Sequence, residues 1–357
     1  MIFKQIIRFL SISLLFLSSS VAVNSNELVG ESFVSNQVSV TLIKNMHPLH
    51  NVLSMWKNKY NRKYESSEEE SVRFDNFIAN HKLIKEHKAT TYKLKLNQFA
   101  DLSRSEYLSR FNPYKIDNFG KGIKFEPTCD MIENAPESID WRQASLNPKK
   151  IKAVNGIKNQ QQCGSCWAFS AVASIEGAWA VAGNQLVSLS EQELVDCSQS
   201  YGNQGCNGGL MDDAFQFVIA NGGICSESAY PYQAADGTCQ SQSCTSVAKI
   251  STFHDVQTMN ETAIFAALQI GPISIAIEAD QESFQFYSGG VYSDPSCGTN
   301  LDHGVNLVGY GTDSSSNQNY WILRNSWGQT WGEAGYMRIL RGQNICGLAT
   351  VPSFPSV

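Results

Sequence analysis

Two cysteines of this chain stand in a sequence context that favours a reactive thiol. Cys163 and Cys166 lie within Gln-Gln-Gln-Cys-Gly-Ser-Cys-Trp-Ala-Phe-Ser, residues 160–170. A Cys-x-x-Cys pair can be a redox dithiol, half of a zinc site, or a disulfide cysteine followed by a nucleophile. The redox motif usually lies in a thioredoxin-like βαβ unit and a zinc site needs a second pair of ligands, and the sequence offers neither. The pattern therefore favours Cys166 as a nucleophile and Cys163 as half of a disulfide.

The residues around Cys166 predict how its thiol would be activated. A helix is expected to begin near Ser165 and to run through Ile175, so that Cys166 opens it. The N-terminus of a helix carries partial positive charge, which stabilises a thiolate. A buried structural thiol is the alternative, and this context disfavours it.

The motif Cys-Gly-Ser-Cys-Trp at residues 163–167 is a signature of papain and the cathepsins. The chain resembles the papain family of cysteine proteases, and within it the cathepsin L branch, from about Trp56 to Val357. The resemblance implies an α+β, papain-like two-lobed fold with a helical left lobe and a β-barrel-like right lobe, preceded by a mainly helical inhibitory pro-segment. It also implies a cysteine-type endopeptidase that needs no cofactor and no metal.

The resemblance assigns roles that nucleophilic attack on a peptide bond requires. Cys166 would attack the carbonyl carbon, and His303, in Leu-Asp-His-Gly, would stabilise the thiolate and protonate the leaving amine. Asn325, in Asn-Ser-Trp-Gly, would orient the imidazole through its amide oxygen. Trp327 would shield that hydrogen bond from water. The side chain of Gln160 and the backbone N–H of Cys166 would bind the oxyanion.

The resemblance also implies a substrate cleft, bordered by Trp327, with an apolar pocket. Gly208 and Gly209 match the segment whose backbone pairs with an extended substrate. The positions that match the S2 pocket are all apolar or small, and they are Leu210, Met211, Ala276, Leu301, Gly304 and Val351. Because position 351 holds no acid that would attract a basic side chain, we expect a preference for Leu or Phe at P2.

The ten cysteines indicate an oxidising compartment, and nine of them follow residue 135. The resemblance implies three disulfides, Cys163–Cys206, Cys197–Cys239 and Cys297–Cys346. Cys225 and Cys244 can form a fourth bridge, which the sequence alone does not establish. Cys129 is then left in the pro-segment.

The N-terminus predicts a secretory signal peptide, residues 1–23. Lys4 and Arg8 precede an apolar run from Phe9 to Leu17, and small residues follow it. The run is shorter than the roughly 20 residues that a membrane span needs, and no later segment is long and apolar enough. We therefore expect the secretory pathway, with a lysosome, an acidic vacuole or the extracellular space as the destination.

Residues 24–134 are expected to be the inhibitory pro-segment. Residues 55–88 show a helical pattern in which one narrow stripe mixes charged, aromatic, amide and aliphatic side chains, unlike a plain amphipathic helix. The stripe resembles the family's interspersed helix motif and consists of Glu69, Arg73, Phe77, Asn80 and Ile84, with Lys88 in place of the last Asn.

A second motif and a linker follow in the pro-segment. After a short predicted strand at 92–96, the residues that resemble the family's second motif are Asn97, Phe99 and Asp101, with Lys95 where Gly is usual. Residues 112–134 contain two prolines and two glycines and are expected to form an exposed linker, a natural place for proteolytic cleavage.

Residues 135–357 are expected to be the peptidase domain, with a helical first half and a β-rich second half. Helical signals are a capping box from Ser190 to Glu193 and a helix over 212–220. Strands are predicted at 272–277, 304–310 and 320–324. The spacing from Trp141 to Gln160 is longer than in the cathepsin L branch, so we expect a surface loop around 146–150.

The charge of the chain divides at the same boundary. Residues 1–134 carry 18 Lys+Arg and 14 Asp+Glu, whereas residues 135–357 carry 9 and 19. A basic pro-segment on an acidic peptidase predicts mutual attraction that weakens as acid neutralises carboxylates. Drift in surface composition explains the same numbers equally well. The acidic peptidase part argues against nucleic-acid binding.

Three other functions are weaker interpretations. An exopeptidase of the same family would need an inserted loop or a retained peptide that blocks the cleft, and no long insertion follows Cys206. A catalytically inactive binding homologue is disfavoured because Gln160, Cys166, His303 and Asn325 are all present. A thiol–disulfide oxidoreductase would require Cys163 not to be bonded to Cys206.

The expected partners are peptide and protein substrates, the pro-segment as inhibitor, and cystatin-type inhibitors, with the protein a monomer. Asn260-Glu-Thr262 is a candidate glycosylation site. His254, the other histidine of residues 135–357, is expected to be a surface or structural residue.

Overall fold

The computed structural model describes residues 48–109 and 119–357, and these divide after Lys63 into two compact units. The signal peptide expected at residues 1–23 lies outside the described residues. Among the helices of the described ranges, none combines the length and the apolar character that a membrane crossing requires.

Helix α2 (His50–Lys59) belongs to the first unit, where the rings of Trp56 and Tyr60 lie 5.3 Å apart. The helical pattern predicted over residues 55–88 is confirmed in most of that range, but the structure divides it between α2 and a second helix, α3 (Ser67–Glu86). The backbone of Asn61 has a φ of 50°, which an α-helix does not contain, so α2 ends before it.

The second unit begins at Tyr64 and includes α3 (Ser67–Glu86), whose N-terminus is capped by the Ser66 side chain. The predicted strand at 92–96 is present but shorter, as β1 (Tyr92–Leu94). It pairs antiparallel with β8 (Tyr287–Tyr292). Helix α4 (Arg104–Leu108) follows, and a reciprocal capping box starts it.

The predicted exposed linker at 112–134 lies partly outside the described residues; residues 119–134 are mostly exposed, but they contain regular structure. Residues 119–134 contain β2 (Ile123–Phe125) and α5 (Cys129–Glu133). Strand β2 pairs in parallel with β6 (Thr252–Val256), and the Phe125 ring packs edge-on against Phe354 at 5.4 Å. The turn residues that predicted a linker thus flank a strand whose pairing partner lies far away in the sequence.

The helical half of the peptidase part is built around α6 (Cys166–Val181), which consists almost entirely of small and apolar residues. A helix without a polar face is buried on all sides. Helices α7 (Glu191–Cys197) and α8 (Met211–Ala220) pack against α6, and β4 (Ile224–Cys225) pairs with β5 (Ser246–Ala248).

The predicted start of α7 is half right. Ser190 caps the helix by accepting a hydrogen bond from the N–H of Glu193. The Glu193 carboxylate accepts from the N–H of Cys225 at 2.7 Å, so it does not return to close the predicted capping box.

The second half contributes most of a ten-stranded sheet, to which β1, β2 and β3 from earlier in the chain are added. Its order is β1-β8-β11-β10-β9-β7-β12-β6-β2, with β3 beside β9. The remaining strands are β3 (Ile139–Asp140), β7 (Ile273–Ile277), β9 (His303–Thr312), β10 (Asn319–Arg324), β11 (Tyr336–Leu340) and β12 (Ser353–Ser356). The short helices are α9 (Glu261–Ala267) and α10 (Glu282–Gln285), with single 3₁₀ turns at Ala144–Leu146, Gln199–Tyr201, Ser241–Ser243 and Ile345–Gly347. Strands β7, β9 and β10 match the three strands predicted from the sequence.

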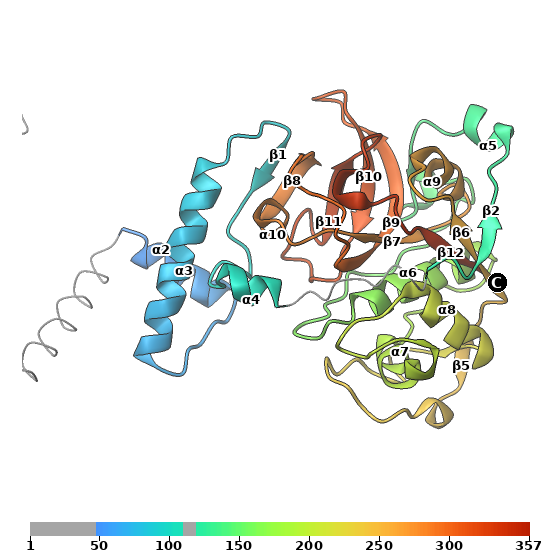
Figure 1. Cartoon of the computed structure of the whole chain (residues 1–357), viewed down its shortest axis with the longest axis horizontal. Coiled ribbons are helices and arrows are strands. Elements are labelled where there is room, and N and C mark those ends of the chain that lie inside the picture. Colours follow the sequence, from blue (N-terminus) through green and yellow to red (C-terminus); the bar gives the residue numbers. More distant parts are fainter. Residues whose placement is uncertain (1–47, 110–118) are drawn as a thin grey trace, which may run out of the picture. The chain divides into compact units, whose positions relative to one another are not determined.

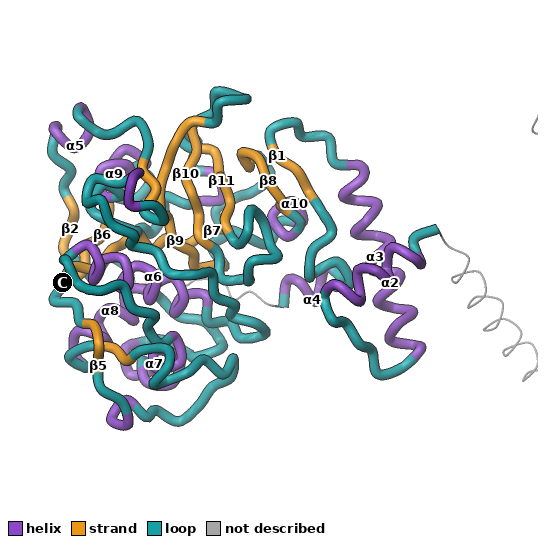
Figure 2. Tube along the Cα trace, turned by 180° about the vertical axis from the view of Figure 1, so that it is seen from behind, coloured by secondary structure: helices purple, strands orange, loops and turns teal. Residues whose placement is uncertain are grey.

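Helix α6 lies between the large sheet and the helices α7 and α8, as Figures 1 and 2 show from opposite sides. Hydroxyl groups join the two halves. Ser170 Oγ on α6 donates to the carbonyl of Val305 at 2.6 Å, and Ser174 Oγ lies 2.7 Å from Ser274 Oγ. The expected α+β architecture with a helical half and a β-rich half is confirmed.

Candidate active site

The predicted nucleophile is the first residue of α6. Cys166 keeps its thiol, since Cys163 is bonded to Cys206, and only 7% of its surface is exposed. The N–H groups of the first helical turn have no acceptor within the helix. Their partial positive charge lowers the free energy of a thiolate at this position.

His303 opens β9, and Asn325 directly follows β10, the antiparallel neighbour of β9. This pairing brings the two side chains together, with His303 Nε2 2.8 Å from Asn325 Oδ1. The Trp327 ring lies over the imidazole, with ring centroids 4.8 Å apart and planes tilted by 30°. All three side chains are buried, so water has little access to the hydrogen bond.

The hydrogen-bond pattern fixes the proton on His303. Asn325 Oδ1 also accepts from the N–H of Ser326 at 2.7 Å, which sets the orientation of the amide. An amide oxygen only accepts, so Nε2 of His303 must carry a hydrogen. The other ring nitrogen, Nδ1, is therefore the one that gains and loses a proton.

Gln160 is fixed by bonds to both of its functional groups. Its Oε1 accepts from the hydroxyl of Ser326 at 2.7 Å, and its Nε2 donates to the carbonyl of Cys163 at 3.0 Å. Its backbone N–H donates to the carbonyl of Ser326 at 2.9 Å. The amide NH₂ has two hydrogens, so one remains for a second acceptor.

The start of α6 and the start of β9 belong to one packed unit. Phe169 and Ser170, one turn after Cys166, line a common small cavity with Gly304 and Val305. The Ser170–Val305 bond spans the same contact. The thiol and the imidazole thus come from elements that pack directly against each other.

Three buried charged residues and the half-buried Lys158 support the segments that carry the site. Lys158 lies 2.7 Å from Glu191 and 3.4 Å from Glu176. Arg324, at the end of β10, lies 3.6 Å from Glu176. Since buried charges are stable only when they are paired, these contacts hold the chain before Gln160 and the end of β10 in place.

Side chains are disfavoured at both glycines that match the substrate-pairing segment. A Cβ on Gly209 would clash with Asn203 Oδ1 and lie 2.7 Å from the Trp167 ring. Gly208 has a φ of 111°, which other residues rarely adopt. The packing at Gly209 and the backbone conformation at Gly208 therefore each require glycine.

The residues expected at the S2 pocket fall together in the structure. Four of their side chains are buried and belong to one apolar cluster, and they are Met211, Ala276, Leu301 and Val351. Leu210 is also buried but is not part of that cluster. Gly304 lies opposite Ala276 in the pairing of β7 with β9. Phe119 of the pro-segment, half-buried, packs against the same cluster.

Two carboxyl groups next to this cluster bind residues 121–122, which belong to the expected pro-segment. Lys121 Nζ lies 2.7 Å from Asp213, and the N–H of Gly122 donates to Asp255 at 2.6 Å. Burial, together with the negative charge of Asp255, raises the pKa of the neighbouring Asp212 to about 7. One proton is therefore retained on this pair in acid.

A second part of the pro-segment lies against Trp327. The Phe99 ring meets the indole edge-on, with centroids 5.3 Å apart. Gln98 Nε2 donates to the carbonyl of Trp327 at 2.9 Å, and the Tyr107 hydroxyl donates to the carbonyl of Ala279 at 2.8 Å. The indole that covers His303 is thus itself covered by the pro-segment.

The predicted motif stripe on α3 explains how this part of the pro-segment is held. Arg73 Nη1 lies 2.7 Å from Glu106 Oε1. Asn80 Nδ2 donates to the carbonyls of Ala100 and Leu102, each at 2.9 Å. The polar members of the stripe therefore bind the chain that carries Phe99.

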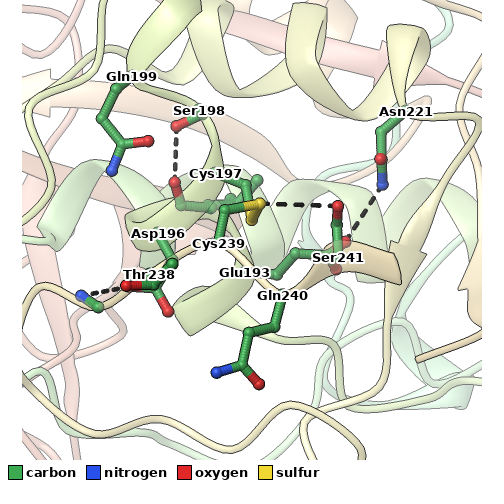
Figure 3. Close-up of a disulfide and its surroundings, with 12 residues drawn as sticks. Glu193, Asp196, Cys197, Ser198, Gln199, Asn221, Thr238, Cys239, Gln240 and Ser241 are labelled. Atoms are coloured by element: carbon green, nitrogen blue, oxygen red, sulfur yellow. Dashed lines mark hydrogen bonds between the residues drawn. A yellow bond between two sulfur atoms is a disulfide. The ribbon is translucent and has the colours of Figure 1, made fainter. Parts of the chain in front are cut away.

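The four disulfides of the structure are Cys163–Cys206, Cys197–Cys239, Cys225–Cys244 and Cys297–Cys346. They are the three pairs implied by the resemblance and the fourth that the sequence left open. Figure 3 shows the bridge from Cys197, at the end of α7, to Cys239. Within the described ranges, one set of three ligand-type side chains lies close enough for a metal, and its two cysteines are those of the Cys225–Cys244 bridge.

Two other residues singled out in the sequence have structural roles. Asn260 caps α9 by accepting from the N–H of Ala263 at 3.0 Å. The His254 ring stacks on Phe354 with centroids 5.0 Å apart.

Sequence reasoning missed Ser326 and Tyr232. Ser326 stands inside the Asn-Ser-Trp-Gly motif, so the motif itself was a signal. The Tyr232 hydroxyl bonds to residues that lie 67 and 72 positions earlier, a separation that no local pattern encodes.

Comparisons with known proteins agree with this geometry. Residues 135–356 match the family model described as papain family cysteine protease, and residues 54–107 match the cathepsin propeptide inhibitor domain (I29). The chain is 42% identical to procathepsin L of Mus musculus over 313 residues, covering 85% of this chain and 90% of that one. It is 43% identical to a cathepsin L-like peptidase of Aedes aegypti over 318 residues, covering 85% and 91%. Digestive procathepsin L 3 of Tenebrio molitor superposes with a TM-score of 0.75 at 39% identity, covering 87% of this chain and 100% of that one.

Proposed function

The chain belongs to the papain family of cysteine proteases, and on that premise we propose that it is an acid-active endopeptidase that is made as a zymogen. It hydrolyses peptide and protein substrates with an apolar residue at P2. The signal peptide and the pro-segment are residues 1–23 and 24–134, and the peptidase domain is residues 135–357. The enzyme passes through the secretory pathway to a lysosome, an acidic vacuole or the extracellular space.

Cys166 is the nucleophile and His303 its acid–base partner. The imidazole takes the thiol proton on Nδ1, and the resulting thiolate attacks the carbonyl carbon of the scissile bond. The imidazolium then gives that proton to the leaving amine, which leaves an acyl-enzyme. A water molecule, deprotonated by the same nitrogen, hydrolyses the thioester and restores the thiol.

The observation that carries this mechanism is the His303–Asn325 hydrogen bond of 2.8 Å beneath Trp327. It commits Nε2 to donating and leaves Nδ1 for the thiol. Because the orienting group is a neutral amide, it holds the ring without adding a charge. The indole keeps water from competing for this bond.

The oxyanion is bound by the backbone N–H of Cys166 and by the second N–H of Gln160. The Ser326 hydroxyl supports this assignment, because its bond to Oε1 of Gln160 keeps the NH₂ side of the amide turned away from it. Preorganised donors of this kind stabilise the tetrahedral intermediate more than the substrate.

The apolar S2 pocket is supported by the buried cluster around Met211, Ala276 and Val351. The half-buried Phe119, from the segment before the peptidase part, packs against the same large cluster. Changing Val351 to Glu should then raise the cleavage of substrates with Arg at P2, because the new carboxylate lies among the pocket residues.

The pro-segment inhibits the enzyme by covering both ends of the site. Phe99 packs on Trp327, Phe119 packs against the cluster that contains the S2 residues, and residues 123–125 add strand β2 to the sheet. Its removal would therefore open the cleft to a substrate.

Doubly blocked peptides with Phe, Leu or Arg at P2 test the proposal. They have no free end, so an endopeptidase cleaves them and an exopeptidase does not. Acid-activated protein should cleave the Phe and Leu peptides at least tenfold faster than the Arg peptide. Cys166→Ala should abolish the cleavage, while Cys129→Ala, at an exposed thiol of the pro-segment, should leave processing and activity intact. Failure to cleave any blocked peptide would favour an exopeptidase, and failure to cleave any peptide an inactive homologue.

A further inference from the structure

Tyr232 lies in the loop after β4, and its hydroxyl reaches two segments of the site. The oxygen lies 2.6 Å from Ser165 Oγ and 2.9 Å from the carbonyl oxygen of Gln160. Ser165 is the residue before Cys166 and the N-cap of α6. One hydroxyl thus joins the residue before the thiol to the residue whose side chain faces the oxyanion.

The direction of these two bonds is fixed by chemistry. A carbonyl oxygen only accepts, so Tyr232 gives its one hydrogen to Gln160. Ser165 must then donate its hydroxyl hydrogen to the Tyr232 oxygen. Burial raises the pKa of Tyr232, so its hydroxyl keeps its proton at acidic and neutral pH.

The position of this hydroxyl is set independently of the site. The Tyr232 ring packs edge-on against Phe169, with centroids 4.9 Å apart and planes at 83°. Its backbone N–H donates to Glu227 at 2.9 Å. Both anchors hold the ring even when the hydroxyl is removed, so the hydroxyl can be tested separately from the packing.

The alternative support for the Gln160 carbonyl is weak. Its other hydrogen bond comes from the N–H of Cys163 at 3.4 Å, longer than usual for such a bond. Ser165 makes no side-chain capping bond to α6, so its hydroxyl is committed to Tyr232. The Tyr232 hydroxyl is therefore the short, well-directed contact between these two segments.

We propose that Tyr232 is a positioning residue for the oxyanion hole. It holds Gln160 and the first turn of α6 at a fixed separation, so that the Gln160 side chain and the Cys166 N–H converge on one point. Donors in an oxyanion hole act within a narrow range of distances, so a small drift of one donor costs rate without weakening substrate binding. This inference rests on the proposed function, in which these two groups bind the oxyanion.

The test compares Tyr232→Phe with Tyr230→Phe, a matched control two residues away. The Tyr230 hydroxyl donates to Asp196 at 2.8 Å, away from the Gln160 and Ser165 groups. For a blocked amide substrate, Tyr232→Phe should lower kcat about tenfold and change KM less than twofold, whereas Tyr230→Phe should keep kcat within twofold. Ser165→Ala should lower kcat by a smaller factor, because it removes only the donor to Tyr232.

Two further measurements separate positioning of the oxyanion hole from a general structural effect. A peptide aldehyde forms an adduct whose oxygen occupies the hole, so its affinity should fall in step with kcat. Alkylation of Cys166 by iodoacetamide forms no oxyanion, so its rate and pH profile should not change. When Gln160 is already replaced by Ala, Tyr232→Phe should lower log kcat by less than half as much as it does in the wild-type enzyme.

Unchanged kcat in Tyr232→Phe would overturn the inference, as would an equal fall in the alkylation rate. The same holds if the Tyr230→Phe control loses as much activity. The proposed function would be contradicted by different results, namely activity that remains in Cys166→Ala or an unchanged kcat in Gln160→Ala.

Discussion

Replacing Asp212 by Asn should remove a large part of the pH dependence of stability. Asp212 lies in the first turn of α8 with no exposed surface, beside the carboxyl group of Asp255 on β6. Burial and the neighbouring carboxylate both oppose its ionisation and raise its pKa to about 7 from the ordinary 3.8. Asparagine has nearly the same shape and carries no charge at any pH.

The size of the effect follows from proton linkage. Between these two pKa values the folded protein keeps a proton on Asp212 that the unfolded chain releases. A raised folded-state pKa gives a contribution to stability that is complete below the unfolded value and is lost as the pH rises through the folded value. A difference of about three pH units, at about 1.4 kcal/mol per unit, gives about 4 kcal/mol between pH 4 and pH 8.

Urea unfolding at pH 4 and pH 8, followed by tryptophan fluorescence, measures this difference. The parent and Asp212→Asn are both compared in a Cys166→Ala background, which prevents self-digestion. From pH 4 to pH 8 the free energy of unfolding of the parent should fall by about 4 kcal/mol more than that of the variant. Asp75→Asn, on the exposed side of α3, should follow the parent. Equal pH dependence in the parent and in Asp212→Asn would refute the reasoning.

Two further predictions concern the pro-segment and the cleft. Phe99→Ala removes an aromatic contact with Trp327 and should weaken the binding of the pro-segment by about 3 kcal/mol. The variant precursor should therefore be processed to the mature enzyme at a higher pH than the wild type, as gels across a pH series would show. Val72→Ala, at a side chain 57% exposed on α3, is the control, and identical pH profiles of processing for Phe99→Ala and the wild type would contradict the expectation. Gly209→Ala places a Cβ in steric conflict with Asn203 Oδ1, so the backbone of this segment must shift. The kcat/KM for a blocked peptide should then fall at least tenfold. A wild-type kcat/KM would show that the segment accommodates the Cβ without loss of substrate binding.

The sequence was most informative where function is carried by local motifs. The helix that begins at Cys166, the strand that begins at His303 and the Asn-Ser-Trp-Gly turn were each visible as short patterns. Each pattern combines a chemical requirement with a local conformational one. For that reason the fold class and the elements of the candidate site could be predicted without coordinates.

The sequence failed where structure depends on distant partners. The break between α2 and α3 is a different case, because a local signal for it was present. Ser66, three positions before Glu69, has the residue type and spacing of an N-cap. Strand β2 was read as part of a linker because its stability comes from pairing with β6, more than a hundred residues later. The hydroxyl of Tyr232 could not be assigned for the same reason.

The most direct test of the central claim is to titrate acid-activated enzyme with a thiol-directed epoxide inhibitor and map the modified residue by mass spectrometry. The mechanism predicts one label per molecule, on Cys166, with loss of activity proportional to labelling. Labelling should follow a pH profile that reports an imidazole-paired thiolate, because in the proposed mechanism the imidazolium of His303 donates through Nδ1 to the thiolate of Cys166. Full activity in protein that is labelled on Cys166, or complete inactivation with the label on another residue, would contradict the account.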